Sequence, residues 1–195
     1  MAGLGFSSGG DFKPYIAYNA KSGKWSMKKD GVDTEVEKPT FVIGFDTIKT
    51  GYMYFATGQA PQYAWNPSLS QKIPRPEGVG ADGKPNFKEG FAVDLFSNKH
   101  FGGVVEFCSS SMIVRDAINV LYTAYEEGKS ANPGKLPVVE SNGTTKVVGR
   151  HGTNYSPNFK ITSWVDKPVE FSQSAPANQS AEAPPAPARS AVSEF

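Results

Sequence analysis

Apolar and polar positions alternate over short stretches along most of the chain between residues 12 and 171, a pattern typical of strands. β-branched and aromatic runs predict strands at 13–19, 24–27, 40–45, 48–55, 91–96, 100–107, 136–140, 144–148 and 158–165. A Lys-Ser-Gly turn at 21–23 joins the first two strands into a predicted hairpin. Asn142 and Gly143, a dipeptide typical of type I′ turns, predict a second hairpin. The chain is therefore predicted to be mainly β.

A single segment, about 110–127, has helical periodicity, with its predicted apolar face made of Ile113, Ala117, Val120, Leu121 and Ala124. OB-fold barrels, which are five-stranded Greek-key barrels, place a helix between their third and fourth strands. The order of strands, helix, hairpin and strand predicts such an OB-fold-like barrel with extra hairpins. A β-sandwich with one crossing helix fits the same pattern.

Composition divides the chain into three parts. Residues 1–11 are rich in Gly and predict a flexible N-terminus, and 12–171 form the predicted domain. Residues 172–195 are rich in Ala, Pro, Ser and Gln and predict a disordered tail that ends in Phe195. Inside the domain, 58–90 holds five Pro and five Gly, which predicts a long irregular insertion.

Several classes of protein are excluded by composition. One cysteine cannot form an internal disulfide or a cysteine-based zinc site, and it suits a reducing, cytoplasmic compartment. No apolar run is long enough to span a membrane, and the first residues lack the pattern of a signal peptide. Phosphate-loop and nucleophile-elbow motifs are absent, His100 and His151 lack metal-ligand spacing, and Cys108 has no evident base. We expect no catalysis, metal or cofactor.

The net charge of +1 conceals an uneven distribution. Windows 12–29, 47–76 and 141–165 contain no acid and together carry +11, so the remaining residues carry −10. The same windows hold nine of the eleven Trp and Tyr residues. Binding of single-stranded nucleic acid needs this combination, because cations follow the phosphates and aromatic faces stack on bases.

The windows supply a set of candidate binding residues. The candidate stacking residues are Tyr15, Tyr18, Trp25, Tyr52, Tyr54, Tyr63 and Trp65. The candidate phosphate contacts are Lys13, Lys21, Lys24, Lys28, Lys29, Lys49, Lys72 and Arg75. Each ring could instead belong to a β core, and Trp164 in the closing strand favours that interpretation.

Two stretches resemble phage-type single-stranded DNA-binding proteins: FVIGFDTIKTGYMYF at 41–55 and GTNYSPNFKITSWVDKP at 152–168. The tail with a terminal Phe resembles them too. This resemblance implies an OB fold, sequence-tolerant binding of single-stranded DNA, and contacts of Glu194 and Phe195 with replication or recombination enzymes. It also implies the cytoplasm of a host cell, and small coating proteins often act as homo-oligomers. Tails of that group usually end in several acids before Phe, whereas Glu194 stands alone here.

The first hypothesis is therefore a non-enzymatic protein that coats single-stranded DNA. A β-sandwich structural protein of a virion, or a carbohydrate-binding module, is the alternative, because aromatic rings beside Asn, Gln and Gly also suit sugar stacking. A third hypothesis is an enzyme whose chemistry the motifs do not reveal.

Overall fold

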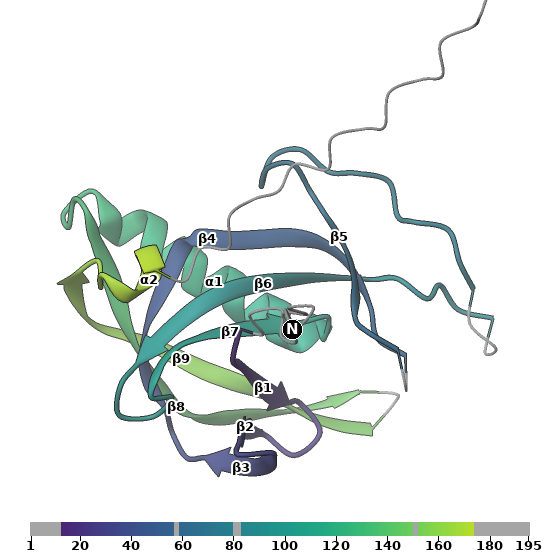
Figure 1. Cartoon of the computed structure of the whole chain (residues 1–195), viewed down its shortest axis with the longest axis horizontal. Helices are drawn as coiled ribbons and strands as arrows, with labels where there is room; N and C mark the ends of the chain where they lie inside the picture. The colour runs from purple at the N-terminus through teal and green to yellow at the C-terminus, as the bar shows by residue number, and fades with distance from the viewer. Residues whose placement is uncertain (1–12, 57–58, 80–82, 150–151, 174–195) are drawn as a thin grey trace, which may run out of the picture.

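The computed structural model of the chain describes residues 13–56, 59–79, 83–149 and 152–173. Within these residues the chain is mainly β, with nine strands in one sheet that curls into a half-barrel, and two helices (Figure 1). The strands are β1 (Tyr15–Asn19), β2 (Lys24–Lys29), β3 (Val32–Val36), β4 (Thr40–Tyr54), β5 (Gln62–Trp65), β6 (Lys88–Ser97), β7 (Gly103–Ser109), β8 (Lys135–Gly149) and β9 (Gly152–Asp166). The helices are α1 (Met112–Lys129) and α2 (Glu170–Gln173).

The predicted terminal segments lie almost entirely outside the described residues. This holds for 1–11 and for the tail from 174 onward, including Glu194 and Phe195. Ser172 and Gln173, at the start of the predicted tail, form the end of α2.

The strands are ordered β3-β2-β1-β7-β6-β4-β8-β9 across the sheet, and β5 pairs separately with β4. Every pairing is antiparallel except that of β1 with β7. The sheet curls far enough for β9 to approach the first hairpin, where Tyr155 N donates a hydrogen bond to Ala20 O at 2.7 Å. α1 packs against the concave side of the sheet through Val114, Ile118 and Leu121.

The predicted helix is confirmed within two residues at each end, and the first hairpin is confirmed as β1 and β2. The two strands predicted at 40–45 and 48–55 are one strand, β4, with a register shift between Gly44 and Lys49. Thr47 holds this bulge: its hydroxyl donates to Gly44 O at 2.8 Å and accepts from Asp94 N at 3.0 Å. Because side chains alternate in a strand, the bulge changes which residues of β4 face the core.

The predicted hairpin turn at Asn142 and Gly143 is wrong. β8 runs through both residues, and the irregularity there is a register shift between Ser141 and Thr144. Gly143 has a φ of 78°, which a bulge can require as readily as a turn does. The β8–β9 pairing extends further, to Gly149 opposite Gly152.

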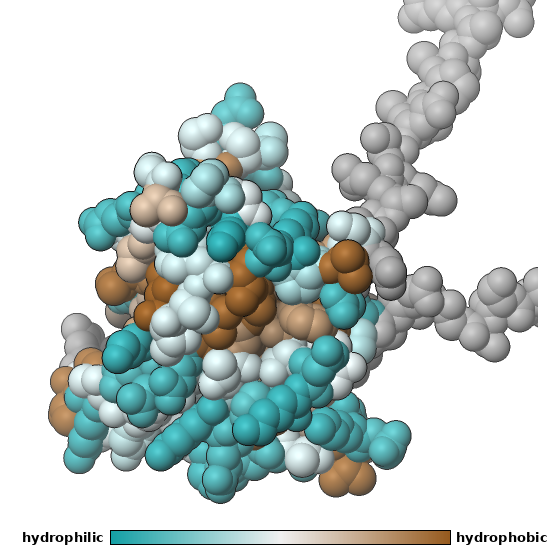
Figure 2. Space-filling view, turned by 90° about the vertical axis from the view of Figure 1, so that its left-hand side faces the viewer, coloured by the Kyte–Doolittle hydropathy of each residue, from teal (hydrophilic) through white to brown (hydrophobic). Residues whose placement is uncertain are grey.

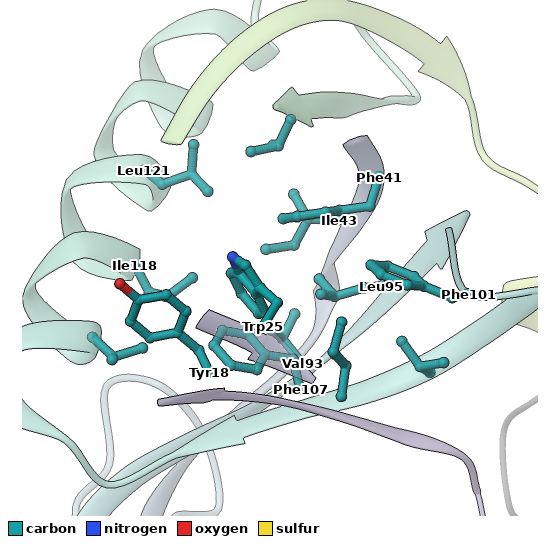
Figure 3. Close-up of a cluster of buried hydrophobic side chains, with 14 of the residues drawn as sticks. Tyr18, Trp25, Phe41, Ile43, Val93, Leu95, Phe101, Phe107, Ile118 and Leu121 are labelled. Carbon is teal, nitrogen blue, oxygen red and sulfur yellow. The ribbon is translucent and has the colours of Figure 1, made fainter. Parts of the chain in front are cut away.

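The main core lies on the concave face of the sheet, with Trp25 near its centre (Figure 3). The indole of Trp25 is 4% exposed and packs against four rings, with centroids 4.9 to 6.2 Å away. These rings are Tyr18, Phe41, Phe107 and Phe159. Trp25 Nε1 donates to Ser141 Oγ at 2.9 Å, so the polar edge of the buried indole is satisfied.

The predicted stacking roles of Trp25 and Tyr18 are therefore wrong. Tyr18 is 8% exposed, and its hydroxyl donates to Tyr155 O at 3.0 Å. Lys24 and Lys28, which made Trp25 look like a surface residue, alternate with it along β2 and are exposed. Neither buried ring offers a face to a nucleobase.

A smaller apolar cluster occupies the convex side at the α2 end, where Phe171 packs with Val42 and Leu136. Figure 2, which views this end, shows apolar side chains gathered between hydrophilic ones. No helix in the described ranges is long and apolar enough to cross a bilayer.

Replacing Trp25 tests its assignment to the core. Trp25→Ala should lower the free energy of unfolding by about 3–5 kcal/mol, because it leaves a large cavity and an unpaired Ser141 hydroxyl. Urea denaturation measures the change. Lys28→Ala on the same strand, with an exposed side chain, should change stability by no more than about 0.5 kcal/mol. Similar stability of Trp25→Ala and the wild type would contradict the core assignment.

Candidate nucleic-acid interface

We call the concave face that carries α1 and the main core the inner face, and the opposite face the outer face. On the C-terminal half of β4, the bulge turns Lys49, Gly51 and Met53 outward. They lie opposite Ala92, Gly90 and Lys88 of β6, in that order. Phe91, which lies between Gly90 and Ala92 in β6, points inward into the core. The two faces of this part of the sheet therefore carry different residues.

Three aromatic rings follow one another on the outer face, and we call Phe55, Tyr63 and Trp65 the aromatic ladder. Tyr63 and Trp65 lie in β5 opposite Met53 and Gly51. The rings of Tyr63 and Trp65 are stacked, with centroids 5.1 Å apart and planes 11° from parallel. Phe55 meets Tyr63 edge-on at 6.1 Å. Phe55 and Tyr63 are 51% and 41% exposed, so the ladder is a surface feature.

Two glycines allow the ladder to lie close to the sheet. A Cβ at Gly51 would overlap the carbonyl oxygen of Ala64 and lie 2.8 Å from Trp65 Cα. A Cβ at Gly90 would come within 2.7 Å of Met53 Sδ. Met53 is consequently only 1% exposed although it points outward, and it forms an apolar floor beside Tyr63.

The outer face carries lysines on β4 and β6 and neutral titratable groups near β7. Lys49 and Lys88 are exposed, and neither has an ion pair within the described part of the chain. On the β7 side, burial raises the pKa of Tyr63 to about 12, and the charges of Cys108 and Glu106 add to the rise. Burial likewise raises the pKa of Cys108 to about 11. Both groups are thus neutral near pH 7.

The outer face continues across β7 to the first hairpin. Tyr15 lies opposite Glu106 and is 41% exposed. Lys24 and Lys28 also point outward on β2, since Trp25 and Met27 point inward. Lys24 forms an ion pair with Glu35 at 2.7 Å, and Lys13 forms one with Asp94 at 2.6 Å. Of these three lysines, only Lys28 has no ion pair with another residue in the described ranges.

Four predicted residues lie instead on the inner face or above it. Tyr52 and Tyr54 point inward after the bulge, and both are partly buried. The Arg75 guanidinium covers the Tyr52 ring at 5.5 Å, and Tyr54 packs on Phe87 at 5.7 Å. Lys72 pairs with Glu89 at 3.6 Å. These residues do not join the ladder, because the β4 backbone separates them from it.

Two predicted phosphate contacts, Lys21 and Lys29, lie in the first hairpin. Lys21 lies in the turn between β1 and β2, Lys29 ends β2, and both are exposed. The described residues contain no group of three His, Cys, Asp or Glu side chains that could hold a metal ion.

Phe55 and Lys88 belong to the candidate interface, and the sequence did not predict them. Phe55 continues the outward alternation of Lys49, Gly51 and Met53, which is visible only once the bulge is known. Lys88 lies outside the acid-free windows, next to Glu89.

A substitution at Gly51 tests whether this glycine positions the ladder. Gly51→Ala should lower the free energy of unfolding by about 1–3 kcal/mol and weaken the near-UV circular dichroism of the Tyr63–Trp65 stack, because its methyl group displaces β5. Gly149→Ala is the control, since a Cβ there meets nothing within 4 Å. Identical spectra for the two variants would show that β5 does not depend on the glycine.

Comparison of the chain with protein-family models, with curated proteins and with solved structures finds no match.

Proposed function

We propose that the protein binds single-stranded DNA by stacking bases on the aromatic ladder, and that it does so without catalysing a reaction. The observation that carries this proposal is the nearly parallel stack of the exposed Tyr63 on the half-buried Trp65, with the exposed Phe55 at its end. A π face stacks with every base, so such a surface binds without strong sequence preference.

The cations beside the ladder support a defined path for the phosphates. Lys49 and Lys88 lie near the β4–β5 pairing, and since neither forms an ion pair with another described residue, both can contact a phosphate. Glu106 of β7 is close enough to act on Tyr63, and its charge would repel a phosphate placed near it. The DNA backbone is therefore expected close to Lys49 and Lys88, with its bases turned toward Tyr63 and Trp65.

A modified OB fold is the finer architecture that we propose. β4 pairs with both β6 and β8, β6 pairs with β7, β8 pairs with β9, and α1 lies between β7 and β8. These five strands correspond in order to the five strands of an OB barrel, in which the helix follows the third strand. β1 pairs with β7, where the fifth strand would close a minimal barrel.

This correspondence supports the location of the interface. OB folds bind oligonucleotides on the face of strands 2 and 3, flanked by the loop between strands 1 and 2 and by the loop between strands 4 and 5. In the proposed assignment, strands 2 and 3 are β6 and β7, and the first of these loops is the insertion that contains β5. The ladder thus lies where the fold is suited to hold a strand. Roles for the tail in recruiting replication or recombination proteins, and for self-association, remain proposals from the sequence.

Removing one ring of the ladder should weaken DNA binding. Trp65→Ala and Tyr63→Ala should each raise the dissociation constant for oligo-dT by about five- to a hundredfold, because each removes a stacking platform. Fluorescence anisotropy with labelled oligo-dT measures this. Trp65→Phe keeps an aromatic face and should retain most of the affinity. Unchanged affinity in Trp65→Ala, with the fold intact by circular dichroism, would reject the ladder as the binding site.

Lys49 and Lys88 should each contribute to the salt dependence of DNA binding. Lys49→Ala and Lys88→Ala should each reduce the slope of log K against log salt by about 0.7, the value expected for one phosphate contact on a single strand. Lys99→Ala is the control, since Lys99 is exposed outside the outer-face binding path, in the β6–β7 turn. An equal change in slope for all three variants would indicate diffuse attraction by net charge.

A further inference from the structure

A cavity of about 400 Å³ opens on the inner face, away from the aromatic ladder. It lies between α1, the inward-facing Ile48 and Thr50 of β4, and the segment that follows β5. Its apolar walls are Ile48, Leu69, Phe91 and Ile118. A space of this size accommodates one flat heteroaromatic ring with a sugar attached.

Asn66 holds the segment that carries Leu69, which forms one wall of the cavity. Asn66 N donates to Thr50 O at 2.8 Å, and Asn66 Nδ2 donates to Thr50 Oγ1 at 2.9 Å. Asn66 Oδ1 accepts from Ile73 N at 3.1 Å. The segment carrying Leu69 is thus anchored to β4 at one end and closed on itself at the other, so the cavity is largely preformed.

Two polar side chains of α1 line the cavity without a partner. Asp116 and Asn119, three residues apart, are exposed and therefore adjacent on the helix surface. Neither side chain has a hydrogen bond or an ion pair with any other residue that the structure describes. Arg115, beside them, bonds Glu89 through Nη1, while its buried Nε has no hydrogen-bond partner in the described ranges.

The chemistry of these groups indicates a class of ligand. A carboxylate accepts hydrogen bonds from an exocyclic amino group, and an amide can both donate to and accept from the edge of a base. Two cations lie near Glu89, which lines the cavity: Lys72 is 3.6 Å from it, and Arg75 covers Tyr52, the residue opposite Glu89 in β4. We propose that the cavity binds a single amino-bearing nucleobase, with its phosphate directed to Lys72 and Arg75.

This proposal does not rest on DNA binding by the ladder, which lies on the other face of the sheet. In titrations of the full chain followed by NMR, AMP and CMP should show saturable binding at least about fivefold tighter than UMP, which has no amino group on its base. Asn119→Ala and Asp116→Ala should weaken AMP binding tenfold or more. Val120→Ala is the matched control on α1, since Val120 is 70% exposed and outside the cavity, and it should leave AMP binding unchanged.

The outcomes separate the two proposals. Equal binding of AMP and UMP, no saturable binding, or an equal effect of Val120→Ala and Asn119→Ala would each overturn the cavity assignment. Loss of AMP binding in Trp65→Ala would also overturn it, because the nucleotide would then be stacking on the ladder. Absence of oligo-dT binding, together with AMP binding that depends on Asn119, would overturn the proposed function and leave the cavity assignment standing.

Discussion

The curled sheet depends on the burial of Trp25. Its indole packs against rings from β1, β4, β7 and β9 and donates to Ser141 in β8, so one side chain contacts strands from both ends of the sheet. The first hairpin is otherwise joined to the β9 side by few polar contacts, among them the hydrogen bonds that involve Tyr155. Curling the sheet around this indole separates a concave face, filled by the core and α1, from a convex face that remains available. The first hairpin therefore contributes Tyr18 and Trp25 to the core.

The bulge in β4 determines what the available face carries. Before the bulge, Phe41, Ile43 and Phe45 point into the core; after it, Ile48 does, and Lys49 and Gly51 point outward. Without the bulge, strict alternation would bury Lys49 and expose Ile48. Gly51 then allows β5 to approach, and Tyr63 and Trp65 are placed over Met53 on the outer face. A backbone irregularity in one strand thus separates the ladder from the cavity with Asp116 and Asn119 on the opposite face.

The sequence predicted the helix and most strands, because these elements depend on residues close together in the chain. The periodicity of 110–127 predicted α1, and alternation predicted most strands, because each signal depends on neighbouring residues.

Burial of Trp25 was not predictable, since Lys24 and Lys28 lie beside it in sequence but point to the other face. The bulge at Thr47 begins at Gly44, but it is held by a hydrogen bond from Asp94 N, a contact between strands far apart in sequence, so the sequence did not predict it. β3 was missed because four of its five residues are exposed and two are acidic. Tyr63 and Trp65 were predicted as binding residues, but their stacking arises from pairing with β4.

The central claim is that bases contact the outer aromatic ladder and not the first hairpin, and ultraviolet cross-linking of the full chain to oligo-dT tests it most directly. After digestion, mass spectrometry identifies the residues joined to thymine. Cross-links at Phe55, Tyr63 or Trp65, and none at Tyr18 or Trp25, are the predicted result. Cross-links concentrated at Tyr18 or Trp25 would contradict the account, because those rings would have to leave the core to meet a base.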